Sequence, residues 1–133
     1  MTRYLLDTNI LSDLIRNPQG RAAKRIAKAG EANVCTSIIV AAELRYGSAK
    51  SGSAKLRKAV EDLLGEIDVL PFEAPADADY GAIRASLELV GTPIGGNDLL
   101  IAAHAQALGA TIVTANTQEF KRVRDVKVEN WLA

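Results

Sequence analysis

Three acidic side chains lie at positions where the sequence offers them no matching cation. Asp7 directly follows the apolar run Tyr4-Leu5-Leu6, Glu43 lies within an apolar helical stretch, and Asp98 opens another one after Gly95-Gly96-Asn97. Carboxylates that converge without cations repel one another unless a divalent ion neutralises them. Together the three residues predict a site for a hard, oxygen-preferring ion, Mg²⁺ with Mn²⁺ as a substitute.

Each of these acids also has an ordinary structural explanation. Asp7 suits the cap at a strand end, Glu43 suits a partly exposed helix position, and Asp98 suits the first turn of a helix, where the macrodipole stabilises an anion. The prediction of a metal site therefore rests on the three acids as a set.

The sequence does not favour a zinc site or a histidine-based mechanism. His104 is the only histidine, and it lies six residues after Asp98, about 120° away around an ideal helix. The single Cys35 lies in an apolar context and is interpreted as a small buried residue. The residue types favour metal-assisted phosphoryl chemistry, with His104 in a structural role.

The elements that must position these acids follow an α/β pattern, because short apolar runs alternate with amphipathic segments. We expect a single domain over residues 1–133, with an open, mostly parallel sheet of about five strands sandwiched by helices. In such sheets ligands bind outside the carboxyl ends of the strands. The predicted strands are 4–7, 34–36, 67–70, 111–114 and 126–128, and the predicted helices are 9–16, 20–29, 37–49, 53–64, 76–90 and 97–108.

The charges are balanced overall but divided along the chain. The 16 Lys and Arg equal the 16 Asp and Glu, so no global field holds nucleic acid. Residues 1–60 nevertheless carry 11 basic and 4 acidic side chains. These basic residues are interpreted either as solvated helix faces or as a rim that contacts phosphates, and the candidates are Arg16, Arg21, Lys24, Arg25, Lys28, Arg45, Lys50, Lys55, Arg57 and Lys58.

The chain has no apolar run of the length that a membrane span needs, and its first residues lack the pattern of a signal peptide. We therefore expect a cytoplasmic protein that does not contact a membrane.

Four ordered motifs make the chain resemble a known family. It is similar to the PIN-domain ribonucleases, and among them to the VapC-type toxins of type II bacterial toxin–antitoxin pairs. The resemblance covers nearly the whole chain and rests on Tyr4-Leu5-Leu6-Asp7-Thr8-Asn9-Ile10-Leu11-Ser12, Ala41-Ala42-Glu43-Leu44-Arg45-Tyr46-Gly47, Gly96-Asn97-Asp98-Leu99-Leu100-Ile101-Ala102-Ala103-His104-Ala105 and Val113-Thr114-Ala115-Asn116-Thr117-Gln118-Glu119-Phe120.

The resemblance implies roles for individual residues. Asp7, Glu43 and Asp98 correspond to the acidic catalytic residues of the family, with Asp7 and Asp98 as direct magnesium ligands. Glu43 would orient or deprotonate the attacking water. Many PIN domains have a fourth acid where this chain has Asn116, so whether Asn116 or Glu119 fills that position, and whether one or two ions bind, stay open.

Two further polar residues, Asn9 and Thr114, are candidates to support the acids, with a purely structural role as the alternative for both.

The resemblance also implies an activity and partners. It implies a Mg²⁺-dependent endoribonuclease that leaves 5′-phosphate and 3′-hydroxyl ends, with the anticodon loop of initiator tRNA as substrate. It further implies a homodimer that is silenced by a VapB-type antitoxin, with DNA bound only through that antitoxin. Apolar Leu11, Leu14 and Ile15 are candidates to line a groove for the antitoxin, with core packing as the alternative.

Two other hypotheses about the function stay open. One is a non-catalytic PIN module that binds nucleic acid or regulates, although retention of all three acids argues against it. The other is a magnesium-dependent phosphatase, which would need a second aspartate in the place of Asn9 in Asp7-Thr8-Asn9.

Overall fold

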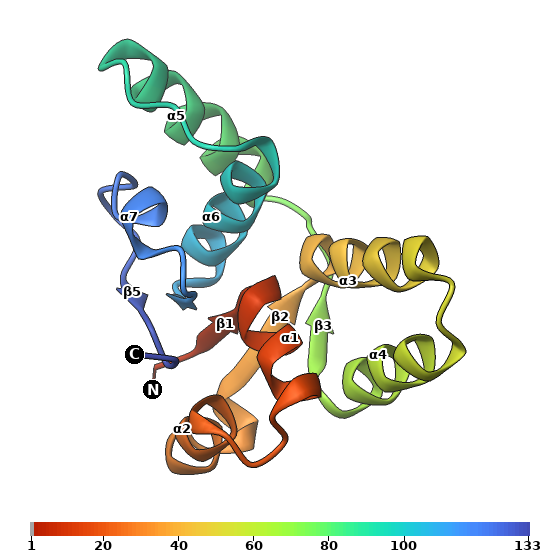
Figure 1. The fold of residues 1–133 in the computed structure, drawn as a ribbon. Coiled ribbons are helices and arrows are strands. Elements are labelled where there is room, and N and C mark those ends of the chain that lie inside the picture. The colour runs from red at the N-terminus through yellow and green to blue at the C-terminus, as the bar shows by residue number, and fades with distance from the viewer. Residues whose placement is uncertain (1) are drawn as a thin grey trace.

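A five-stranded parallel sheet runs through the molecule in the order β3-β2-β1-β4-β5 (Figure 1). The computed structural model describes residues 2–133. The expected open α/β sheet with helices packed around it is confirmed, and every strand pair is parallel. The strands are β1 (Tyr4–Leu6), β2 (Val34–Ser37), β3 (Asp68–Leu70), β4 (Thr111–Val113) and β5 (Val128–Glu129); the helices are α1 (Thr8–Arg16), α2 (Arg21–Ala29), α3 (Ile38–Ser51), α4 (Ala54–Glu66), α5 (Ala76–Leu89), α6 (Gly96–Leu108) and α7 (Thr117–Phe120), with a 3₁₀ turn at Glu31–Asn33.

The central strand β1 forms the middle of the core. Leu5 pairs with Cys35 of β2 on one side and with Ile112 of β4 on the other. Leu5, Leu6 and Ile112 are fully buried. This short, continuous apolar run is what a strand needs when helices cover both faces of a parallel sheet.

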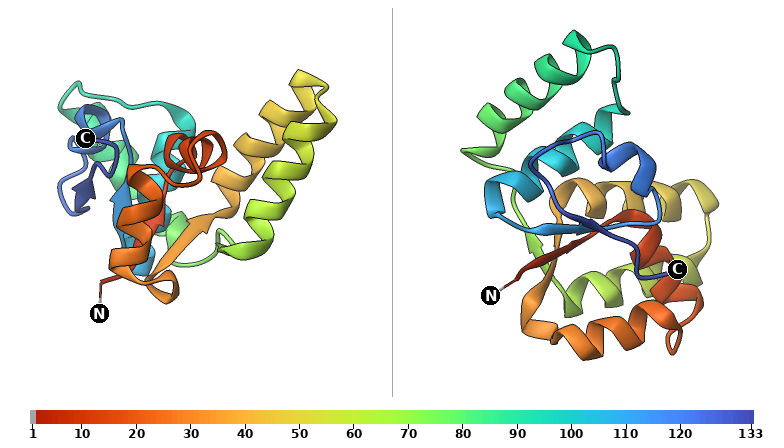
Figure 2. Two further views of the ribbon diagram at one scale, coloured as in Figure 1. Left: turned by 60° about the horizontal axis from the view of Figure 1, so that its bottom comes forward. Right: turned by 90° about the vertical axis from the view of Figure 1, so that its left-hand side faces the viewer.

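The helices pack in two groups that can be followed in the ribbon views. Helix α1 lies in front of β1 and β2 in Figure 1 and contacts α2, α3 and α4, whereas α5 packs along α6. Helices α3 and α4 run side by side and project away from the sheet (Figure 2). In the described part of the chain, no helix combines the length and apolar character that crossing a bilayer requires.

Two strands pass directly into helices at the carboxyl edge of the sheet. Asp7 follows β1 and caps α1, because its side chain accepts a hydrogen bond from the Thr8 backbone N–H. Ser37 ends β2 and caps α3 by accepting from the Ile39 N–H. These tight junctions fix where α1 and α3 begin, and they bring the Asp7 and Glu43 segments to the same edge.

The predicted bounds are correct within one or two residues for the six longer helices, but the last strand is misplaced. The ladder uses Val128–Glu129, which pair with Ile112 and Val113, rather than 126–128. Val126 is buried as part of the core outside the ladder. In the sequence, an apolar residue that packs beside a strand therefore cannot be distinguished from one that lies in the strand.

Candidate active site

The Asp7 carboxylate is buried and held by three neighbours. Its side chain belongs to a residue only 4% exposed. Oδ1 accepts from the Thr8 N–H at 2.8 Å, and Oδ2 accepts from the Thr114 hydroxyl at 2.8 Å and the Asn9 amide at 3.4 Å. Burial raises the pKa of Asp7 above its ordinary value, and the charge of Glu43 adds to this, although the hydrogen bonds oppose it.

Asn9 and Thr114 join the start of α1 to the end of β4. The side-chain Nδ2 of Asn9 lies 3.3 Å from the Thr114 hydroxyl, and its side-chain Oδ1 accepts from the Ala115 N–H at 2.9 Å. The Thr114 hydroxyl accepts from the Asn116 N–H at 2.9 Å. The structure thus places both residues in direct contact with Asp7, where they fix the orientation of its carboxylate.

Glu43 lies half-buried in the middle of α3 and faces α1. Its Oε1 accepts a hydrogen bond of 2.8 Å from the Thr8 hydroxyl. Glu43 forms no ion pair within the described residues 2–133. Thr8 was not among the site residues predicted from the sequence. The only signal that the sequence offers for Thr8 is its position next to Asp7.

Asp98 lies in the first turn of α6, as predicted, and shares its surroundings with other acids. The pKa of its carboxyl is raised to about 7 by burial first, then by the negative charges of Glu119, Asp7 and Glu43. Asp98 therefore lies within the electrostatic field of three further carboxylates, which come from the β1–α1 junction, α3 and α7.

Glu119 reaches this cluster from the short helix α7, which the sequence analysis did not predict. Its Oε1 accepts from the Gly95 N–H at 2.6 Å and its Oε2 from the Asn116 amide at 2.7 Å. These hydrogen bonds lower the pKa of Glu119. The same Asn116 amide nitrogen lies 3.3 Å from Asp98 Oδ2, so Asn116 bridges the two acids.

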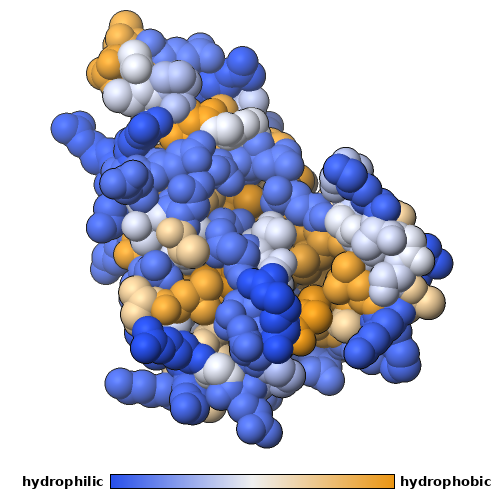
Figure 3. Space-filling model, in the orientation of Figure 1, coloured by the Kyte–Doolittle hydropathy of each residue, from blue (hydrophilic) through white to orange (hydrophobic). Residues whose placement is uncertain are grey.

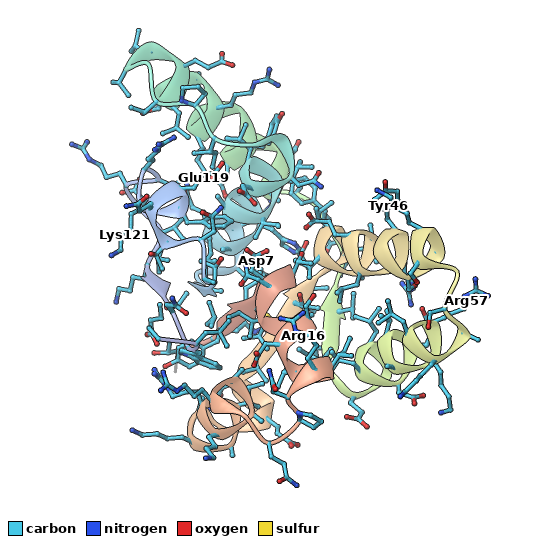
Figure 4. The ribbon with its side chains drawn as sticks, viewed as in Figure 1. Asp7, Arg16, Tyr46, Arg57, Glu119 and Lys121 are labelled. Carbon is cyan, nitrogen blue, oxygen red and sulfur yellow. The ribbon has the colours of Figure 1, made fainter. Side chains whose placement is uncertain are left out.

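Figure 4 shows Asp7 and Glu119 on the same side of the sheet, above its carboxyl edge. A Cβ atom on Gly95 would lie 3.5 Å from Glu119 Oε1 and 3.8 Å from Asp98 Oδ2. Glycine at this position therefore leaves the space beside these two carboxylates open.

The donor set fits a hard divalent cation. Within the described residues, no three His, Cys, Asp or Glu side chains already converge at ligand spacing. The charged groups that act on Asp98 are nevertheless all carboxylates, and their mutual repulsion is the force that a cation would relieve. Carboxylate oxygens are the ligands that Mg²⁺ and Mn²⁺ prefer. Asp7 and Asp98, the two predicted ion ligands, both belong to this group of carboxylates.

Cys35 and His104 lie away from this chemistry. Cys35 is buried in β2, and burial raises the pKa of its thiol to about 11. His104 is buried in α6, and its Nδ1 lies 2.8 Å from the Ser37 hydroxyl. His104 therefore joins α6 to the cap of α3, which agrees with the structural role predicted for it.

Burial of His104 leads to a prediction for stability at acidic pH. Burial lowers the pKa of His104, so the unfolded chain binds its proton at higher pH than the folded chain does. The wild type is expected to lose the stability that the neutral, buried His104 contributes as pH falls below about 6.5. A His104→Gln variant lacks the titration, so the difference in free energy of unfolding between wild type and variant should shrink as pH falls from 7.5 to 5.5. Urea unfolding at both pH values measures the gap, and a constant gap would contradict the prediction.

Comparison with known proteins identifies the family that this chain is similar to. The PIN domain family matches residues 4–126. The tRNA(fMet)-specific endonuclease VapC of Shigella flexneri is 39% identical over 98% of this chain and 99% of its own length. Ribonuclease VapC2 of Rickettsia felis is 40% identical over 96% of this chain and 97% of its own.

A solved structure gives the same result. VapBC2 from Rickettsia felis, bound to a DNA fragment from its promoter, superposes on this fold with a TM-score of 0.88 at 37% identity, covering 98% of this chain and 99% of that chain. The expected resemblance to PIN-domain ribonucleases and to VapC-type toxins is thereby confirmed for both sequence and fold.

Proposed function

The chain belongs to the PIN-domain family and, within it, to the VapC ribonucleases, and we propose that it cleaves tRNA with a divalent cation held by Asp7 and Asp98. It is an endoribonuclease and the toxin of a toxin–antitoxin pair, with a VapB-type antitoxin as partner. PIN-domain ribonucleases use divalent metal, and we propose Mg²⁺, with Mn²⁺ as a substitute, for this chain.

One observation carries the proposal of a metal-dependent site. The carboxyl of Asp98 has a pKa of about 7 because burial and three further acids disfavour its charge. A purely structural acid would gain from the N-terminus of α6 but not from three like-charged neighbours, whereas an ion ligand benefits from negative charge collected at one point. Asp7 and Asp98 would hold the cation, and when bound it would supply neutralisation of phosphate charge and a more acidic water.

The roles of the protein groups follow from their contacts. Asp7 keeps one orientation because Thr8, Asn9 and Thr114 all donate to it. One oxygen of Glu43 is occupied by the Thr8 hydroxyl, and we assign the other oxygen to orienting the attacking water and accepting its proton.

Glu119 is proposed as the fourth acid of the site. It already lies beside Asp98 through the Asn116 amide, whereas Asn116 itself supplies a hydrogen-bond donor rather than a charge. Asn116 then keeps two like-charged groups together in the free protein.

The antitoxin is proposed to occupy a partly apolar cavity beside the acids. This cavity of about 410 Å³ lies between α1, α3 and α4 and includes Ile15, Leu44 and Glu43 in its lining. Apolar residues gather in this region of the surface in Figure 3. Of the three predicted groove residues only Ile15 lines this cavity, because Leu11 is fully buried in the core and Leu14 lines a different one.

The substrate assignment is tested by cleavage in vitro. Protein freed of antitoxin is incubated with total tRNA and Mg²⁺ or Mn²⁺, beside an EDTA control, and the cleaved ends are sequenced. We expect cuts confined to the anticodon loop of initiator tRNA, with 5′-phosphate and 3′-hydroxyl ends. Cyclic 2′,3′-phosphate ends would contradict the mechanism, and cuts in other RNAs alone would contradict the substrate. Absence of any cleavage by folded protein would favour a binding module.

A further inference from the structure

The acidic site cannot by itself hold a polyanionic substrate. The chain has a net charge of zero, and the site contains Asp98 together with three further acids whose charges act on it. Binding of RNA therefore requires cations close to the site but outside it.

Several of the basic residues of the first half are engaged in other contacts. Arg45 pairs with Glu61 and Lys58 with Asp62, both within 2.9 Å, and Arg25 pairs with Glu129 at 3.4 Å. The predicted basic rim is therefore smaller than its residue count suggests, and its useful members are those without acidic partners.

Arg16 is exposed and adjoins the acidic site. It is the last residue of α1, and within the described chain its guanidinium forms no hydrogen bond or ion pair. It lines the cavity that also contains Thr8 and Glu43. Figure 4 shows Arg16 below Asp7 on the same face, whereas Arg57 lies far to the side on α4.

Arg16 also lines a second, polar cavity of about 640 Å³ at the turn between α1 and α2. Arg21 lies in the same lining, and its guanidinium donates a 3.4 Å hydrogen bond to the Leu132 carbonyl oxygen. The one acid in this lining, Asp13, accepts from the Asn17 amide at 2.9 Å. The second cavity thus carries more positive than negative charge, and its size suits a nucleotide.

We propose that Arg16 and Arg21 bind the phosphate backbone of the substrate RNA as it leaves the acidic site along α1. This inference rests on the proposed function. Arg16 lies eight positions after Thr8, which is about 12 Å along the helix, so the two arginines contact phosphates outside the scissile one. They are positioning residues, and they set the affinity for RNA rather than the rate of the chemical step. A segment of antitoxin in the first cavity would close this path.

The test compares four variants in steady-state cleavage of tRNA at several salt concentrations. Arg16→Gln and Arg21→Gln remove one charge each, Arg16→Lys retains it, and Arg57→Gln removes an exposed charge away from the path. Because Arg16, Arg21 and Arg57 are all exposed, melting temperatures of the four variants are expected to stay within about 2 °C of wild type.

We expect Arg16→Gln and Arg21→Gln each to raise KM about 3- to 10-fold with little change in kcat, and to reduce the slope of log(kcat/KM) against log salt by about 0.7. Arg16→Lys should retain the wild-type slope, and Arg57→Gln should behave as wild type.

Three results would overturn the inference while leaving the proposed function intact. These are wild-type KM and slope in both Gln variants, an equal loss in Arg57→Gln, or a loss of antitoxin binding by Arg16→Gln without any change in KM. Absence of cleavage by the wild type would instead refute the proposed function itself.

Discussion

Replacement of Asp98 by asparagine is expected to abolish RNA cleavage and also to stabilise the metal-free fold above neutral pH. In the folded chain the pKa of Asp98 is about 7, well above its ordinary value of 3.8. Between pH 3.8 and about pH 7 the folded chain binds more protons than the unfolded chain. The stability that Asp98 contributes therefore falls as pH rises through this range. Asparagine carries no charge at any pH, so the Asp98→Asn variant does not lose stability in this way.

The stabilisation is reduced by two opposing effects. Asp98 is only partly buried, and its charge interacts favourably with the N-terminus of α6. We therefore expect a gain of about 1–2 kcal/mol at pH 8 in EDTA, which corresponds to about 3–6 °C in Tm, and almost no gain at pH 4.

Thermal unfolding in EDTA at the two pH values measures this effect, with the exposed Asp125→Asn variant as the matched control. Equal Tm values for Asp98→Asn and wild type at pH 8 would contradict the electrostatic description of the site. Full cleavage activity in Asp98→Asn would contradict its role as an ion ligand.

Asp7 allows its structural and chemical roles to be separated by two substitutions. Asp7→Asn keeps an oxygen that can accept the Thr8 N–H and cap α1, but it removes the charge. Asp7→Ala removes both. We expect cleavage to fall at least about 10³-fold in each variant, because each loses an ion ligand.

Stability is expected to distinguish the two variants. Asp7→Ala should lose a further 1–2 kcal/mol or so relative to Asp7→Asn, because the cap is lost and the buried Thr114 hydroxyl loses its acceptor. Urea unfolding and cleavage assays on the same preparations measure both quantities. Substantial activity in Asp7→Asn would show that Asp7 is only a cap.

The fold was predictable because its signals are local. Ser37 marks the start of α3 through its own side chain, and Gly109 ends α6 in the left-handed region, with a φ of 65°, where a side chain would be strained. Such signals depend only on neighbouring residues, so the sequence analysis located the longer helices. Helix α7 has only four residues and gave no periodic signal.

The site was predictable in its acids but not in its contacts. Asp7, Glu43 and Asp98 stand out by type and position, whereas the bonds from Thr8 to Glu43 and from Gly95 to Glu119 join segments distant in sequence. Such bonds depend on how α1 packs on α3, and on how α7 packs against the start of α6. Whether Asn116 or Glu119 takes the position of the fourth acid likewise depends on a contact that only the structure shows. The amide of Asn116 lies between Asp98 and Glu119.

The central claim is that the acid cluster binds a divalent cation that RNA hydrolysis requires. The most direct test measures the cleavage rate of one tRNA against the concentration of free Mg²⁺ or Mn²⁺, for wild type and for Asp98→Asn prepared identically. We predict saturable activation of the wild type, complete loss in EDTA, and no activation of the variant. Cleavage that persists in EDTA, or equal metal dependence in both proteins, would contradict the assignment of the site.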